Sequence, residues 1–160
     1  MHVFLTGPVQ VGKSTAIDRF LAGCGLEPGG FRTRWTPRGI LELRLLETGE
    51  VFPAARRENG RVTADPAAFD AAGRRLLELG CGRALLVMDE LGFLERDAAE
   101  FRRAAETLLD GGVPVLGVLR DRPDNVFRPG LSRRADTVIL TVTEENRDAV
   151  PEQISALLGL

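Results

Sequence analysis

The stretch TGPVQVGKST, residues 6–15, decides the fold of this chain. Within it, Gly7, Gly12, Lys13 and Ser14 match the spacing G-x-x-x-x-G-K-[ST]. A short apolar run, HVFLT, precedes the stretch, and a segment with apolar residues at helical spacing follows it. A strand, a glycine turn and a helix in this order are the setting in which the spacing forms a phosphate-binding loop.

Such a loop binds phosphate mainly through its backbone. Consecutive N–H groups point at the phosphate oxygens, and the N-terminus of the following helix adds partial positive charge. We therefore expect a nucleoside triphosphate to lie against the loop and the first helical residues. These are Gly7, Pro8, Val9, Gln10, Val11, Gly12, Lys13, Ser14 and Thr15.

Lys13 is the only lysine among the 21 basic residues of the chain, and all the others are arginines. A compact ammonium group on a flexible stem can enter a crowded loop and reach the β- and γ-phosphates, where a planar guanidinium would fit poorly. We predict that Lys13 is catalytic and that the Ser14 hydroxyl is a ligand of Mg²⁺. An ordinary lysine at a helix start is the alternative.

A second signal is LLVMDE, a continuous apolar run that ends in Asp89 and Glu90. This pattern is typical of a central parallel strand. At the end of such a strand, Asp89 is expected to hold Mg²⁺, and Glu90 to orient or deprotonate the water that attacks the γ-phosphate. The alternative is that both acids are solvated turn residues or a helix cap.

The remaining patterns alternate between strands and helices. Buried strands are predicted at residues 2–6, 83–90, 113–119 and 137–142, and helices at residues 13–22, from Asp65-Pro66 to Leu79, and at residues 97–110 and 144–158. Residues 29–55 show period two on both sides of a Pro-Arg-Gly turn, which predicts an antiparallel hairpin or small meander. Residues 120–136 are expected to be irregular.

This order predicts an α/β fold with a mostly parallel sheet, helices on both faces and an antiparallel addition. Ligands of such sheets bind beyond the carboxyl ends of the strands. At 160 residues, we expect a single domain spanning residues 1–160.

Composition narrows the class of protein. The net charge is −2 and no long apolar run or signal peptide is visible, so we expect a cytoplasmic monomer that binds neither nucleic acid nor membranes. Cys24 and Cys81 are expected to be free thiols, because neither they nor His2 show metal-ligand spacing.

The stretches TG…GKST, GGFRT, DELGFLE and TEENRD follow one another in this order along essentially the whole chain. In this arrangement the sequence resembles the small cancer-related nucleoside-triphosphatase family. The resemblance implies a P-loop NTPase fold related to RecA-like ATPases and nucleotide kinases. It also implies slow, Mg²⁺-dependent hydrolysis of ATP, GTP and other nucleoside triphosphates.

The chain departs from the family pattern at two positions and keeps it at two others. Gln10 stands where family loops usually carry glycine, and Phe93 stands where a lysine usually follows the DExG element. Gly92 and Glu95 match the family. The change at Phe93 removes a cation from any phosphate or partner contact that the family makes there.

An arginine is expected to stabilise the charge on the transferred phosphoryl group. Arg120 directly follows a predicted central strand, so it should lie beside the phosphate loop. Arg128, Arg133 and Arg134 occupy the irregular segment that could close over the nucleotide. Arg32 is a further candidate, with a solvent-facing strand position as the equal alternative.

Two other groups of residues have a possible role in binding the nucleotide. Asn146 and Arg147 are expected to contact it from the start of the last helix, although helix capping by Thr143 or Glu144 also explains that sequence. Stacking of a base on Phe31 or Trp35 is possible, but packing of the hairpin against the sheet is favoured.

Two other functions remain open besides nucleotide hydrolysis. One is a kinase for a nucleotide or another small molecule, with residues 120–134 as its lid, although no acceptor pocket is readable from the sequence. The other is a nucleotide-switched binding protein in which hydrolysis acts as a timer.

Overall fold

The computed structural model describes the backbone of all 160 residues and every side chain except that of Cys81. In chain order the elements are β1 (His2–Thr6), α1 (Lys13–Cys24), β2 (Gly29–Trp35), β3 (Ile40–Leu45), β4 (Val51–Glu58), β5 (Arg61–Ala64), α2 (Pro66–Leu79), the short 3₁₀ helix η1 (Gly80–Gly82), β6 (Leu86–Leu91), α3 (Ala99–Asp110), β7 (Val115–Leu119), α4 (Arg128–Leu131), β8 (Thr137–Thr141) and α5 (Val150–Leu158). Cys24 is a free thiol, and the predicted free thiol at Cys81 lies outside the described side chains.

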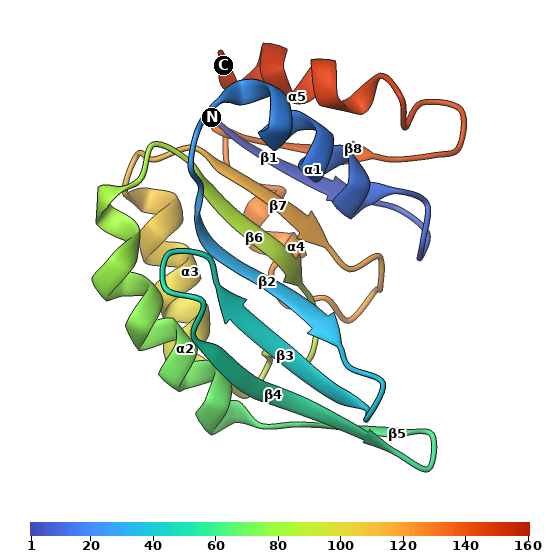
Figure 1. Ribbon diagram of the computed structural model, residues 1–160, viewed down its shortest axis with the longest axis vertical. Helices are drawn as coiled ribbons and strands as arrows, with labels where there is room; N and C mark the ends of the chain where they lie inside the picture. Colours follow the sequence, from blue (N-terminus) through green and yellow to red (C-terminus); the bar gives the residue numbers. More distant parts are fainter.

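All eight strands form one sheet in the order β5-β4-β3-β2-β6-β7-β1-β8 (Figure 1). The strands from β2 to β8 in this order pair in parallel, whereas β2, β3, β4 and β5 form an antiparallel meander. The predicted parallel sheet with an antiparallel addition is therefore confirmed. The carboxyl ends of β2, β6, β7, β1 and β8 lie along one edge.

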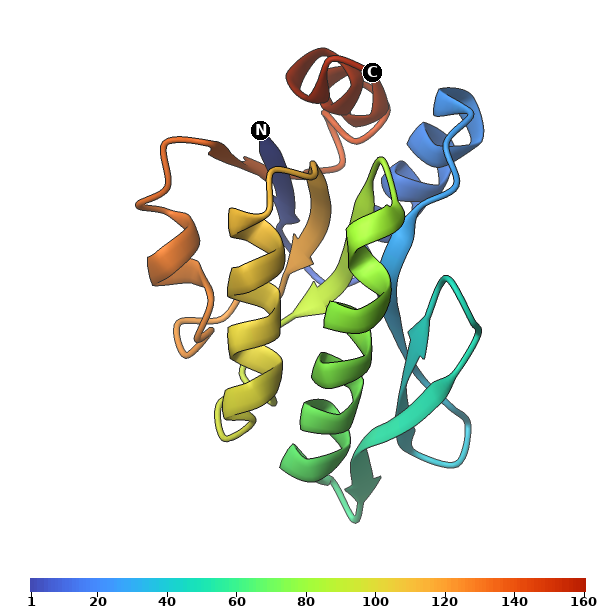
Figure 2. The same ribbon diagram turned by 90° about the vertical axis from the view of Figure 1, so that its left-hand side faces the viewer.

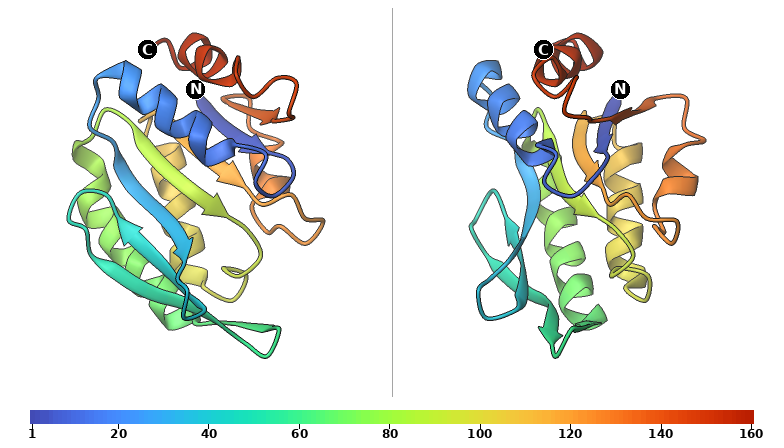
Figure 3. Two further views of the ribbon diagram at one scale, coloured as in Figure 1. Left: turned by 45° about the vertical axis from the view of Figure 1, so that its right-hand side comes forward. Right: turned by 90° about the vertical axis from the view of Figure 1, so that its right-hand side faces the viewer.

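Helices cover both faces of the sheet, as predicted. Helices α1 and α5 pack together on one face, and α2 and α3 pack together on the other (Figures 2 and 3). Among the described residues, no helix combines the length and the apolar character needed to cross a membrane.

Strand β1 belongs to both hydrophobic cores because its side chains alternate between the two faces. Val3 and Leu5 pack in the core under α1 and α5, where Ile17 also lies. Phe4 packs in the core under α2 and α3 together with Phe31. The strand lies between β7 and the edge strand β8, so its carboxyl end opens beside that of β7.

The predicted start of α2 is confirmed. The Asp65 carboxylate accepts a hydrogen bond from the Ala68 backbone N–H at 3.1 Å, and Pro66 occupies the first helical position. A capping carboxylate and a proline without an N–H group both suit this end of a helix, where four N–H groups have no partner in the helix.

The closing helix starts later than predicted. Residues 144–149 form a turn, and α5 begins at Val150. Thr143 and Asn146 hold this turn, because Thr143 N–H donates to Asn146 Oδ1 at 2.8 Å and Asn146 N–H donates to Thr143 Oγ1 at 3.3 Å. These side chains compete with helical hydrogen bonding, and Pro151 occupies the second position of the helix that follows.

Strand β5 was not predicted, although the sequence contains a signal for it. Asn59 and Gly60 both have positive φ, 50° and 75°, in the turn that joins β4 to β5. An Asn-Gly pair between two extended segments is typical of a two-residue hairpin turn. Residues 120–136 are mostly irregular, as expected, but they include the four-residue helix α4.

Candidate active site

The loop between β1 and α1 turns sharply because several residues adopt left-handed backbone angles. Gly7 has a φ of 132° and Gly12 a φ of 114°. A Cβ atom on Gly7 would lie 2.5 Å from the backbone oxygen of Val142, so only glycine fits there. Gln10 has a φ of 62°, a conformation that glycine adopts freely and other residues adopt at a cost.

Lys13 lies across this loop. Its Nζ donates hydrogen bonds to the backbone oxygens of Gly7 at 2.8 Å and Pro8 at 2.6 Å. Partial burial lowers the pKa of the Lys13 ammonium group, while the nearby Glu90 carboxylate opposes this shift. The lysine is therefore held at the mouth of the loop, where incoming phosphate oxygens can replace the two carbonyl groups.

Asp89 lies at the end of β6 and is only 7% exposed. Burial raises the pKa of its carboxyl group, and the Arg32 guanidinium and a hydrogen bond with Ser14 act in the opposite direction. Arg32 pairs with Asp18 of α1 at 2.6 Å and lies opposite Asp89 in the register of β2 and β6. Strand, loop and helix thus bring Ser14, Asp89 and Arg32 together.

Glu90 and Arg120 face the phosphate loop from β6 and from the end of β7. Arg120 Nη1 donates to Glu90 Oε1 at 3.1 Å, and Glu90 N–H donates to Thr33 Oγ1 at 3.2 Å. Both charged side chains line a cavity of about 350 Å³. Its other walls are Val9, Gln10, Gly12, Lys13, Ser14, Thr15 and Val118.

Asn125 fixes the backbone beside Arg120, a role that the sequence did not indicate. This residue is 3% exposed, and its Nδ2 donates to the backbone oxygens of Leu91 at 3.1 Å and Arg120 at 2.9 Å. Its Oδ1 accepts from the Phe127 N–H at 2.9 Å. The burial of Asn125 is visible only in the structure, so the sequence carried no signal for this role.

Comparison with known families identifies the chain. A sequence model of a family described as NTPase matches residues 2–155. The chain belongs to this NTPase family.

Relatives within the family match the chain over nearly its whole length. It is 28% identical to the "Nucleoside-triphosphatase THEP1" of Natranaerobius thermophilus, covering 96% of this chain and 94% of the relative. It is 34% identical to the protein of the same name from Hyperthermus butylicus, covering 96% and 88%. The solution structure of a human cancer-related nucleoside triphosphatase superposes with a TM-score of 0.76 at 26% identity, covering 97% and 95%. The resemblance read from the motifs is therefore confirmed.

A second cavity lies beside the phosphate loop. Asn146 and Arg147 were expected to contact the nucleotide, and only Arg147 lines this cavity. Arg147 contributes to its wall, with Gln10, Gly12, Thr15, Ala16, Arg19 and Asp148. The Asn146 side chain does not line it, because it bonds to the backbone of Thr143 and, through Nδ2, to the Thr141 oxygen at 2.8 Å. Asn146 therefore acts here in the turn before α5.

Of the four candidate arginines named in the segment after β7, only Arg120 lines the phosphate cavity. Arg128 pairs with Asp121 at 3.3 Å, and Arg133 is exposed to solvent. Arg134 pairs with Asp110 and with Asp136, whose backbone oxygen accepts from the first residue of β1. Arg134 thus lies at the opposite edge of the sheet, and the expectation that it could close over the nucleotide is wrong.

The two aromatic residues of β2 differ in their surroundings. Phe31 is 1% exposed and packs edge-on against Phe101, which confirms the packing interpretation. Trp35 is only partly buried, with the Arg57 guanidinium 4.4 Å from its ring centre. Phe93 stands where family members usually have a lysine. The Arg122 guanidinium lies 4.1 Å from the centre of the Phe93 ring, so a positive charge is still present at this position.

Glu95 is a buried acid whose ionisation affects the stability of the fold. Burial raises the pKa of its carboxyl group from 4.5 to about 7, although Oε2 accepts a hydrogen bond from the Gly92 N–H at 3.2 Å. Because this pKa is raised in the folded state, the contribution to stability is fully present below pH 4.5 and lost as the pH rises through about 7.

We predict that Glu95→Gln flattens the pH dependence of the unfolding free energy. Over this window the wild type should lose up to about 3 kcal/mol relative to the variant, at about 1.4 kcal/mol per pKa unit. Urea unfolding at a series of pH values measures the difference between the two slopes. Parallel profiles would show that Glu95 ionises normally.

Proposed function

We propose that this protein hydrolyses nucleoside triphosphates, ATP and GTP among them, to nucleoside diphosphate and phosphate. One observation carries the proposal. Lys13 and Ser14 of the loop, Glu90 of β6 and Arg120 after β7 all line one cavity at the carboxyl edge of the sheet. The names of the relatives, which are nucleoside-triphosphatases, support the same reaction.

The residues at the start of α1 and the end of β6 fit a Mg²⁺ ion. Asp89 is a desolvated carboxylate that hydrogen-bonds Ser14, and a carboxylate with a hydroxyl is an oxygen donor set suited to Mg²⁺. Among the described residues, no group of three or more His, Cys, Asp or Glu could hold a metal ion. When bound, Mg²⁺ would neutralise negative charge on the phosphates.

The protein side chains then have separate roles in the reaction. Glu90 orients a water molecule and accepts its proton while the water oxygen forms a bond to the γ-phosphorus. The bond from this phosphorus to the β–γ bridging oxygen breaks, and the diphosphate leaves with the electron pair. Lys13 and Arg120 stabilise the charge on the transferred group.

The experiment that tests the proposal is phosphate release without any added acceptor. ATP, GTP, CTP and UTP are each incubated with the protein in Mg²⁺ and in excess EDTA. We expect release in Mg²⁺ and its loss in EDTA. A protein that binds these nucleotides but releases phosphate from none of them would overturn the proposal.

Arg120 is the proposed arginine finger, because it is the arginine after β7 that lines the cavity. We predict that Arg120→Ala lowers turnover by at least about tenfold, or about 1.4 kcal/mol, and leaves nucleotide affinity nearly unchanged. Arg133→Ala removes an exposed arginine of the same segment and serves as the matched control. Equal turnover in both variants would assign the charge stabilisation to another group, with Arg32 as the nearest candidate.

The remaining expectations from the sequence stay part of the proposal. We propose a cytoplasmic monomer. We also propose that it binds neither nucleic acid nor membranes, which its net charge of −2 supports. The nucleotide-switch function shares this site and differs in having a protein partner that senses the bound nucleotide.

A further inference from the structure

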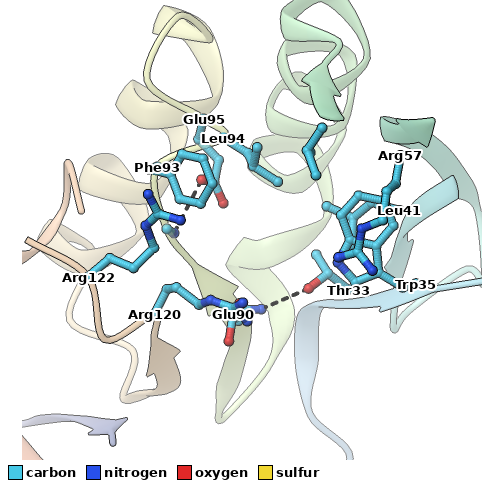
Figure 4. Close-up of a pocket in the computed structure, with 12 residues that line it drawn as sticks. Thr33, Trp35, Leu41, Arg57, Glu90, Phe93, Leu94, Glu95, Arg120 and Arg122 are labelled. Carbon is cyan, nitrogen blue, oxygen red and sulfur yellow. Dashed lines mark hydrogen bonds and ion pairs between the residues drawn. The ribbon is translucent and has the colours of Figure 1, made fainter. Parts of the chain in front are cut away.

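A separate pocket opens on the other side of Glu90 and Arg120 from the phosphate loop. Its volume is about 170 Å³, and Glu90 and Arg120 line both this pocket and the phosphate cavity. Figure 4 shows Trp35 and Arg57 on one side of the pocket, Phe93 and Arg122 on the other, and Glu90 with Arg120 below them. The pocket and the phosphate cavity thus share Glu90 and Arg120 as a common wall.

The walls of this pocket come from segments that are far apart in sequence. Each strand of the antiparallel meander contributes at least one side chain, and the segments after β6 and β7 close the other side. The lining residues are Thr33, Trp35, Leu41, Arg57, Val62, Glu90, Gly92, Phe93, Leu94, Glu95, Arg120 and Arg122. The meander therefore builds a wall that the parallel sheet alone lacks.

The size and the apolar part of the pocket fit one small ring. A cavity of about 150 Å³ with apolar walls is large enough to hold benzene. Trp35 and Phe93 offer aromatic surfaces, and Leu41, Val62 and Leu94 provide aliphatic ones. A planar ring can pack against such side chains.

The charged part of the pocket fits an anion at Arg57. Arg120 pairs with Glu90 and Arg122 pairs with Asp124, so both guanidinium groups have an acidic partner. Among the described residues, Arg57 shows no acidic partner and only covers the Trp35 ring. A carboxylate or phosphate on the bound ring would supply the missing charge.

We propose that this pocket is a second-substrate site, which binds a single-ring molecule that carries one anionic group and one hydroxyl. The anionic group lies at Arg57, the ring packs against Trp35, and the hydroxyl faces Glu90. This inference rests on the proposed function, because the hydroxyl takes the place of the attacking water.

The transfer step follows from the same side chains as hydrolysis. The hydroxyl oxygen of the acceptor forms a bond to the γ-phosphorus, and its proton passes to the Glu90 carboxylate. The bond from the phosphorus to the β–γ bridging oxygen breaks, and the nucleoside diphosphate leaves with the electron pair. The products are a phosphate ester of the acceptor and a nucleoside diphosphate.

Binding is tested first, because Trp35 is the only tryptophan in the chain and reports directly on the pocket. The full-length protein is titrated with benzoate, with meta- and para-hydroxymethylbenzoate, and with benzyl alcohol, which lacks the anionic group. We expect a saturable change in Trp35 emission with the benzoates and a much weaker response to benzyl alcohol.

Two matched variants locate the anion. Arg57→Gln should raise the half-saturating benzoate concentration by at least about tenfold, since it removes a charge-assisted contact. Arg56→Gln removes the preceding arginine, which does not line this pocket, and should leave the titration within about twofold. Absence of a saturable response, or equal responses in the two variants, would overturn the site.

Transfer is tested with ATP labelled at the γ-phosphate. Label should appear in a phosphate ester of a hydroxymethylbenzoate and in no product of benzoate. Arg57→Gln should lower ester formation, while the rate of phosphate release to water stays within about twofold of the wild-type rate. Binding and release without an ester would overturn the acceptor role alone. A protein that binds benzoate but neither releases phosphate nor forms the ester would overturn the proposed function and the acceptor role. The benzoate-binding site would still be supported.

Discussion

Lys13→Ala is expected to abolish productive triphosphate turnover, and Lys13→Arg is expected to lower turnover by at least about 100-fold. Removing one preorganised donor from a developing negative charge typically costs about 10² to 10³ in rate. The structure explains why arginine cannot substitute. The Lys13 ammonium lies between the Gly7 and Pro8 oxygens, at 2.8 Å and 2.6 Å, where a single donor atom fits and a planar fork with three nitrogens does not.

Steady-state phosphate release and nucleotide binding measure the effect of both variants. Arg103→Lys, an arginine–lysine exchange on the exposed surface of α3, controls for the exchange itself and should keep normal turnover. Thermal unfolding confirms that each variant is folded. Near-normal turnover of Lys13→Arg would mean that the shape of the loop does not explain the single lysine of this chain.

Glu90→Gln is expected to lower hydrolysis by about 10² to 10⁴ while nucleotide affinity changes by no more than a few-fold. This range is the usual contribution of a positioned general base. Glutamine keeps an oxygen that can accept from Arg120, so the contact at 3.1 Å and the wall of the cavity are retained. The change therefore removes the negative charge and the proton acceptance of Glu90 and keeps the shape of the side chain.

Asp89→Asn distinguishes the roles of the two neighbouring acids. We expect it to weaken Mg²⁺ dependence and turnover together, because the carboxylate beside Ser14 is the proposed metal ligand. Turnover measured across a Mg²⁺ titration separates this effect from that of Glu90→Gln. Mild and equal effects of the two substitutions would favour the alternative in which both acids only terminate the strand.

The sequence predicted the parallel part of the fold because its signals are local. HVFLT, the glycine loop and the helical spacing after Lys13 each require only neighbouring residues to agree. The predicted start of α5 was too early. Thr143 and Asn146 form reciprocal hydrogen bonds that resemble a helix cap but lie in the turn before the helix. The Asn59-Gly60 turn carried a hairpin signal that would have predicted β5.

The candidate site was predicted where it depends on strand order and missed where it depends on the meander. Lys13 lies after the loop that follows β1, Asp89 lies near the end of β6, and Arg120 directly follows β7. The carboxyl ends of these parallel strands meet at one edge. Trp35 and Arg57 come together only because β3 places β4 beside the sheet, and no spacing in the chain encodes that approach. The pocket beyond Glu90 was therefore invisible in the sequence.

The position of β1 also determines when the nucleotide site can form during synthesis. Val3 pairs with Leu116 of β7 and with Val138 of β8, so β1 waits for partners that are translated long after it. Contacts so distant in sequence slow folding, because the intervening chain must be ordered before they form. Gly7 lies against Val142, just past β8, so the phosphate loop gains its final support only when this late segment arrives. The loop sequence is thus made well before Val142, and its final support forms only after the segment through Val142 has left the ribosome.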